Sequence, residues 1–83
     1  MSLSEQQVME HVREVLAAIA PEVDLAALDP TAPMREELDL DSMDFLRLVQ
    51  ELGQRTGVET PESDYGKLAT LGGMVAYIRA RAP

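Results

Sequence analysis

Hydrophobic residues recur at helical spacing near the start of the chain and predict a first helix from about Ser4 to Ala20. The apolar positions form one narrow stripe, which consists of Val8, Val12, Val15, Leu16 and Ile19. Ser4 and Gln7 have the spacing of a capping box, in which each side chain accepts a bond from the other residue's backbone. Pro21 follows directly and is expected to end the helix.

This pattern breaks between residues 21 and 41. Three prolines exclude a long helix here: Pro21, Pro30 and Pro33. Apolar residues nevertheless continue through the segment, at Val23, Leu25, Leu28, Met34, Leu38 and Leu40. We expect a long ordered crossover with one short turn around Leu25–Leu28. Structureless connections of this length are uncommon in compact domains and often carry function.

A second amphipathic helix is predicted from Ser42 to Thr56, with Gly57 supplying the left-handed residue that ends it. On a helical wheel of about 100° per residue, one broad arc is apolar and contains Phe45, Leu46, Leu48, Val49 and Leu52. The opposite arc is polar and contains Asp44, Arg47, Gln50, Glu51, Gln54 and Arg55. Met43 falls among the polar residues. Either Met43 tucks back into the preceding loop, or it is an exposed apolar contact for a partner.

The rest of the chain predicts one short helix and one longer helix. Thr60 followed by Pro61 is typical of a cap and a first helical residue, and we expect a short helix or turn that ends near Lys67 or Leu68. Thr70 is expected to cap a last helix whose stripe is Leu71, Met74, Val75 and Ile78. The predicted fold is an all-α, small four-helix bundle of three main helices and one short helix, with a long crossover between the first two.

Length and charge limit the partners. The chain has 83 residues, which predicts a single domain over residues 1–83, and it carries 15 acidic against 7 basic residues. Its net charge of -8 disfavours nucleic acid and anionic membranes, and it favours proteins with basic surfaces. Cysteine is absent, which removes disulfides and a thiol nucleophile and fits a cytoplasmic location. We expect no signal peptide and no membrane span.

Neither catalysis nor a dedicated metal site is expected. The only histidine, His11, lies beside the apolar stripe of the first helix and is interpreted as an ordinary surface or boundary residue. Asp39-x-Asp41 resembles the start of a calcium loop, but the later ligand positions of such a loop do not match this sequence. A run of carboxylates could still bind divalent ions loosely: Glu36, Glu37, Asp39, Asp41 and Asp44.

Ser42, at the predicted start of the second helix, has two interpretations. Its hydroxyl can serve as a cap by accepting a backbone N–H bond. A helix start also suits a phosphate, because unpaired N–H groups and the positive end of the helix dipole both favour negative charge. In the first case the chain is an unmodified acidic helical adaptor.

The segment Leu38-Asp39-Leu40-Asp41-Ser42-Met43-Asp44 resembles the Asp-Ser-Leu signature of acyl carrier proteins, which lies at the start of their second helix. The likeness covers nearly the whole chain, because the first helix, the crossover and the stretch from Pro61 to Leu71 follow in the expected order. The resemblance implies that a separate phosphopantetheinyl transferase attaches 4′-phosphopantetheine from coenzyme A to Ser42. Acyl groups would then be carried as thioesters on the arm, and the chain itself would not be an enzyme.

Further roles follow from the same resemblance. Asp41 would help to hold the magnesium ion of the transferase, and Met43 would be an exposed contact beside the arm. The apolar arc of the second helix would line a cleft for an acyl chain. The expected partners are the transferase and acyl-transferring or acyl-modifying enzymes with basic docking surfaces, and the chain is expected to be a monomer. The residues that would meet these partners are Asp39, Met43, Asp44, Arg47 and Glu51.

Some positions depart from the family pattern. The family often has glycine where this chain has Asp39, and Met43 replaces the usual leucine. Thr56 and Thr60 stand where bulky apolar residues are expected, which puts the acyl cleft in question. The implied pathway is fatty-acid, polyketide or a related specialised lipid synthesis, with a peptidyl or aminoacyl carrier less favoured.

Overall fold

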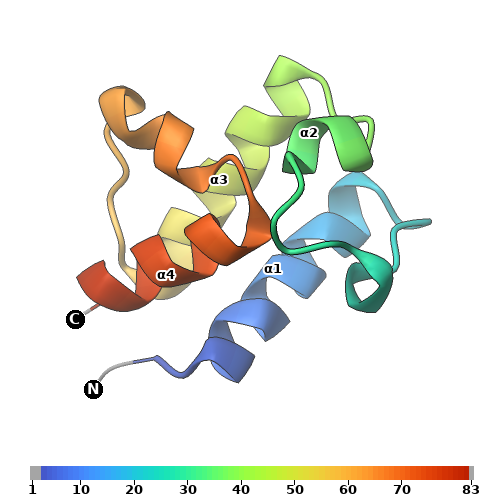
Figure 1. Cartoon of the computed structure of the whole chain (residues 1–83). Coiled ribbons are helices and arrows are strands. Elements are labelled where there is room, and N and C mark those ends of the chain that lie inside the picture. Colours follow the sequence, from blue (N-terminus) through green and yellow to red (C-terminus); the bar gives the residue numbers. More distant parts are fainter. Residues whose placement is uncertain (1–2, 83) are drawn as a thin grey trace.

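A computed structural model describes residues 3–82, which form helices and connecting loops without a β-strand (Figure 1). The α-helices are α1 (Glu5–Ile19), α2 (Met34–Glu37), α3 (Ser42–Thr56) and α4 (Leu71–Arg81), and the 3₁₀ helices are η1 (Leu25–Ala27) and η2 (Glu62–Leu68). The predicted all-α class is therefore confirmed. The three main helices are α1, α3 and α4, and η2 is the short helix. The long crossover connects α1 to α3.

The first helix begins as its capping box predicts. The Ser4 hydroxyl accepts the N–H of Gln7 at 3.1 Å, and the Gln7 side chain accepts the N–H of Ser4 at 2.8 Å. Four residues of the predicted stripe are buried: Val8, Val12, Val15 and Leu16. Ile19 is only half-buried, because the helix ends there and Ala20 occupies the last buried position.

The crossover contains more helix than its sequence predicts. The expected short turn is η1, but α2 was not predicted from the pattern. It is a single turn that follows Pro33. All of its residues after Met34 are charged, so the sequence has no apolar repeat from which this helix could be predicted. Met34 is fully buried, and its N–H donates to the carbonyl of Ala69 at 2.8 Å. These contacts fix α2 beside the end of η2.

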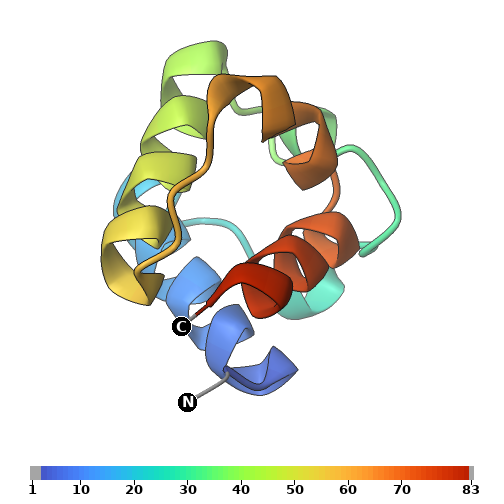
Figure 2. The same ribbon diagram turned by 90° about the vertical axis from the view of Figure 1, so that its left-hand side faces the viewer.

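The core lies where α1, α3 and α4 meet beneath the crossover. Its fully enclosed side chains come from every main helix and from η2, and they include Val12, Leu48, Leu52, Leu68 and Met74. Figure 2 shows η2 spanning the space between α3 and α4. Within residues 3–82, no helix has the length and apolar character that crossing a membrane requires.

Thr60 does not cap the short helix, contrary to the prediction. Pro61 holds the cap position with an extended backbone and no side-chain cap bond, so η2 begins at Glu62. Thr56 is buried, and its hydroxyl donates to the carbonyl of Leu52 at 2.7 Å, which satisfies the polar group inside the core. The cavity near both threonines measures only about 10 Å³. Among the described residues, the two threonines therefore enclose no acyl-sized cavity between them, although Thr60 also lines an open groove of about 1020 Å³ with Val49 and Tyr65.

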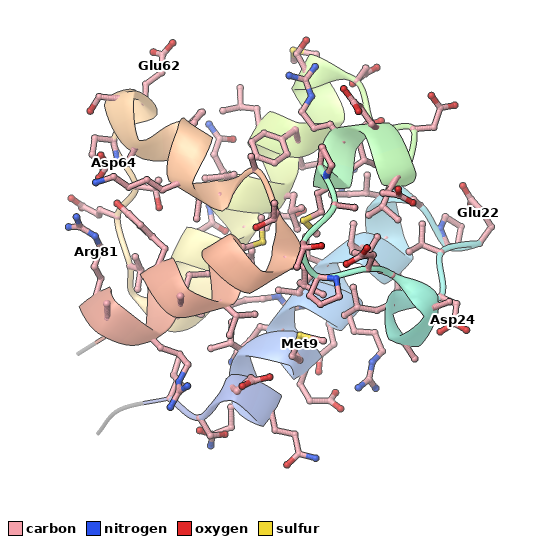
Figure 3. The ribbon with its side chains drawn as sticks, in the orientation of Figure 1. Met9, Glu22, Asp24, Glu62, Asp64 and Arg81 are labelled. Carbon is pink, nitrogen blue, oxygen red and sulfur yellow. The ribbon has the colours of Figure 1, made fainter. Side chains whose placement is uncertain are left out.

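A polar cluster joins η2 to α4. The Tyr77 hydroxyl donates to the Asp64 carboxylate at 2.7 Å, and the Arg81 guanidinium lies 3.5 Å from the same oxygen and 4.5 Å from the centre of the Tyr77 ring. Figure 3 shows Asp64 and Arg81 on the same side of the molecule. The bond from Tyr77 is the main cause that lowers the pKa of Asp64 below its ordinary 3.8, and the charges of Lys67 and Arg81 add to it.

This cluster predicts that the free energy of unfolding depends on pH in the acidic range. The pKa of Asp64 is lower in the folded chain than in the unfolded chain. Its contribution to the free energy of unfolding is therefore fully present above the unfolded pKa of 3.8, and it is lost as the pH falls through the lower folded pKa. Tyr77→Phe keeps the ring and removes the hydroxyl, so it should lower the free energy of unfolding above about pH 5 and matter progressively less below about pH 4. Urea unfolding from pH 3 to 6 measures this, and a deficit that does not vary with pH would contradict it.

Candidate functional site

The residue that caps α3 is Asp41, not Ser42. Asp41 has an extended backbone, with φ -81° and ψ 178°, and its side chain accepts the N–H of Asp44 at 2.8 Å. Ser42 is the first residue inside the helix, so the interpretation of Ser42 as a cap is wrong. The predicted bounds of this helix are confirmed, and Gly57 ends it with a φ of 75°.

Ser42 lies at the open start of α3, which is the positive end of the helix dipole. Its side chain is exposed, and within residues 3–82 its hydroxyl has no hydrogen-bond partner. The backbone N–H groups of Ser42 and Met43 also find no acceptor among these residues. Such donors and the helix dipole favour negative charge, so a phosphate ester at this hydroxyl fits the site. Met43 is 72 % exposed, so it does not tuck back into the preceding loop.

A groove of about 900 Å³ begins at Ser42 and runs between α2, the first turn of α3 and η2. Its apolar lining includes Leu40, Phe45, Leu46 and Tyr65, and its charged lining consists of Arg35, Glu36, Asp39 and Glu62. The rings of Phe45 and Tyr65 meet edge to face, with 6.5 Å between their centres. Only the first turn of the apolar arc of α3 reaches this groove, because Leu48 and Leu52 are buried in the core. Among the described residues, the apolar arc therefore lines this groove with Phe45 and Leu46 alone.

Asp39 has a left-handed backbone, with a φ of 53°. In this region a Cβ atom crowds the backbone, and glycine avoids the cost while aspartate and asparagine tolerate it better than other residues. The backbone angle thus gives a physical reason why the glycine expected from the family resemblance would suit this position. It also shows that the extra charge of Asp39 stands on a turn that precedes Ser42 by three residues.

Substitutions of Asp39 should follow its backbone angle. We expect Asp39→Gly to change the free energy of unfolding by between 0 and about +1 kcal/mol, and Asp39→Val to lower it by about 1–2 kcal/mol. Asp39→Asn serves as the charge control, because asparagine tolerates the left-handed region. Urea unfolding of the three variants measures the order, and a valine variant as stable as the glycine variant would contradict this explanation.

Arg47 and Arg55 each stand four residues from Glu51 on the polar face of α3, a spacing that predicts two ion pairs. The structure contains one of them. Arg47 contacts Glu51 at 3.1 Å, as the spacing predicts. Arg55 does not pair with Glu51, because its guanidinium crosses to Glu14 on α1. The first turn is more acidic: Asp39 and Asp41 are exposed and Asp44 is half-buried beside Met43. Met43, Asp44, Arg47 and Glu51 therefore share one side of α3, and Asp39 stands on the turn before it.

Other kinds of site have little support. Among residues 3–82, no group of three or more histidine, aspartate or glutamate side chains is arranged to hold a metal ion. His11 is half-buried on α1, as expected for a boundary residue, and it does not line the groove. Its Nδ1 atom is buried and has no hydrogen-bond partner among the described residues.

Comparison with known proteins agrees with this geometry. The sequence model of a family described as "Phosphopantetheine attachment site" matches residues 6–78. The chain belongs to this family. An acyl carrier protein of Rubrobacter xylanophilus is 29% identical over 76 residues, which is 92% of this chain and 93% of the relative. One from Helicobacter pylori strain G27 is 34% identical over 67 residues, covering 78% and 86%.

A third relative is more distant. The meromycolate extension acyl carrier protein of Mycolicibacterium aurum is 25% identical over 79 residues, which is 95% of this chain and 80% of the relative. The family match and the relatives together show that the chain is of the acyl carrier protein family, whose prosthetic group is 4′-phosphopantetheine. Members of this family act as carriers.

Sequence reasoning missed Arg35 and did not foresee that Tyr65 faces the groove. Tyr65 lies on η2, which has too few apolar residues for the sequence to predict which of its sides faces the groove. Arg35 had a usable signal: it is the only basic residue between Arg13 and Arg47, in a stretch rich in carboxylates.

Proposed function

We propose that Ser42 carries the 4′-phosphopantetheine arm and that this chain carries acyl groups as thioesters on it, for fatty-acid, polyketide or a related specialised lipid synthesis. One observation carries the assignment to Ser42. Its hydroxyl is exposed at the first residue of α3 and is not needed as a cap, because Asp41 fills that role. The hydroxyl is thus available for an ester, and the helix end favours the charge that the ester brings.

The Ser42 hydroxyl is the only group of this chain that would react in the attachment. The Ser42 oxygen would form a bond to the phosphorus next to the pantetheine of coenzyme A, adenosine 3′,5′-bisphosphate would leave, and the serine proton would pass to a base of the transferase. Asp41 has one carboxylate oxygen bonded to the N–H of Asp44, and its exposed carboxylate supports a role in holding the magnesium ion of the transferase. Because this chain has no cysteine, the arm would supply its thiol.

The proposed partner surface surrounds Ser42. Met43 is the apolar contact, and Asp39, Asp44 and Glu51 supply negative charge, with Arg47 as a local exception. The net charge of -8 supports partners with basic surfaces, and it affects the rate of encounter more than the final affinity. We further propose that residues 1–83 act as a single, monomeric, cytoplasmic carrier domain without catalysis of its own.

Incubation with coenzyme A and a promiscuous phosphopantetheinyl transferase, followed by intact mass measurement, tests the function. The wild-type chain and the variant Ser63→Ala should each gain one phosphopantetheine unit. Ser63 is a matched control, because it is exposed and lies beside carboxylates on η2. An acidic adaptor would gain nothing, and that result would refute the proposal.

A further inference from the structure

We propose that Arg35 pairs with the phosphodiester that joins the prosthetic group to Ser42, and that it thereby positions the root of the arm in the groove. This inference rests on the proposed function. It concerns a residue that neither the sequence motif nor the family match singles out.

Arg35 lies next to the helix turn that bears Ser42. Its guanidinium carbon is 5.9 Å from the centre of the Phe45 ring, and Phe45 lies three residues after Ser42 on the same face of α3. Both Arg35 and Ser42 line the same groove. The backbone of Arg35 also supports this loop, because its carbonyl accepts the N–H of Leu40 at 2.9 Å. The side chain therefore starts from a fixed position beside the attachment point.

Arg35 is the one basic residue whose charge is not engaged within residues 3–82. Of the 7 lysine and arginine residues, the other six donate to a carboxylate or carbonyl: Arg13, Arg47, Arg55, Lys67, Arg79 and Arg81. Arg35 has only the face of Phe45, although Glu36 is its neighbour in sequence. An exposed arginine that rests on an aromatic ring can move to a stronger partner at little cost.

The arm would bring that partner. A phosphodiester keeps one negative charge at neutral pH. On Ser42 it would lie in the same helical turn as two carboxylates, those of Asp41 and Asp44. Among the residues that line the groove, Arg35 is the only cation, against Glu36, Asp39 and Glu62. The planar guanidinium fits phosphate oxygens with two parallel bonds. Arg35 can therefore offset a repulsion that its acidic neighbours would otherwise impose on the modified chain.

The experiment compares unmodified and modified forms of three chains: wild type, Arg35→Gln and Arg47→Gln. Arg47→Gln is the matched control, because it removes the same charge from the exposed face of α3 without touching the groove. Intact mass first confirms the attachment in each chain. The midpoint of thermal unfolding is then measured for each pair at low salt, and the Arg35 Nε–H resonance is followed in the wild type.

We expect attachment to move the Arg35 Nε–H resonance. We also expect it to lower the midpoint of Arg35→Gln by about 1–5 °C more than that of the wild type or Arg47→Gln, with the difference shrinking in 1 M salt. Equal midpoint changes in all three chains, with an unmoved Arg35 resonance, would overturn this inference alone. A wild-type chain that gains no group at all would overturn the proposed function together with it. If Arg35→Gln cannot be loaded, the wild-type chain alone tests the inference: an Arg35 Nε–H resonance that moves on attachment supports it, and one that does not move contradicts it.

Discussion

Replacing Ser42 by alanine is expected to abolish attachment of phosphopantetheine while leaving the fold nearly as stable as before. The loss should be complete, because the oxygen that forms the ester is gone. The free energy of unfolding should change by less than about 0.5 kcal/mol, since Ser42 is exposed and its hydroxyl bonds no residue within 3–82. Intact mass after incubation with transferase and coenzyme A gives the first result, and urea unfolding gives the second.

Two caps provide controls for this prediction. Asp41→Ala and Ser4→Ala should each lower the free energy of unfolding by about 0.5–2 kcal/mol, because each removes a side chain that accepts a first-turn N–H. Ser4→Ala should still take up the arm in full. If Ser42→Ala were destabilised as much as Asp41→Ala, Ser42 would be a cap after all, and if Ser42→Ala still gained the arm, the site would be elsewhere.

The largest effect on stability is expected for Leu48→Ala. Leu48 is fully buried in the middle of α3, so the substitution loses transfer free energy and leaves a cavity, at a cost of about 2–5 kcal/mol. Domains of this kind are stabilised by only about 5–15 kcal/mol, and a loss of this size should move the urea midpoint well below that of the wild type. The variant should then take up the arm poorly at temperatures where it begins to unfold.

Leu46→Ala is the matched control on the same helix. Leu46 is half-exposed and lines the groove rather than the core, so the same substitution should cost clearly less than Leu48→Ala. It should remain a substrate of the transferase. Equal losses for the two leucines would contradict the division of the apolar arc into a core part and a groove part.

The main helices could be predicted because burial imposes a period on the sequence. The valine stripe of α1 and the leucine pattern of α3 have the spacing of a helix face, and the caps at Ser4 and Gly57 mark an end of each. In contrast, α2 has a single buried residue, Met34, and one residue defines no period. Short elements such as α2 and η2 are fixed by contacts that are distant in sequence, such as the bond from Met34 to Ala69.

Local chemistry explains the errors at the helix ends. Aspartate and serine are both good caps, so the sequence Asp41-Ser42 does not tell which of them has the extended backbone. The prediction for Arg55 failed because it considered only neighbours on the same helix, whereas Glu14 of α1 lies within reach in the folded chain. The position of Arg35 against Phe45 likewise depends on how the crossover folds, and no spacing rule gives it.

The central claim is that Ser42 bears the prosthetic group, and the most direct measurement is on the protein purified from the cells that produce it. Cleavage after arginine releases the peptide Glu36–Arg47, in which Ser42 is the only serine. We predict that mass spectrometry will find this peptide extended by one phosphopantetheine unit, with the fragment ions placing it on Ser42. A bare peptide, in cells whose other carriers are modified, or a group found on any other residue, would contradict the claim.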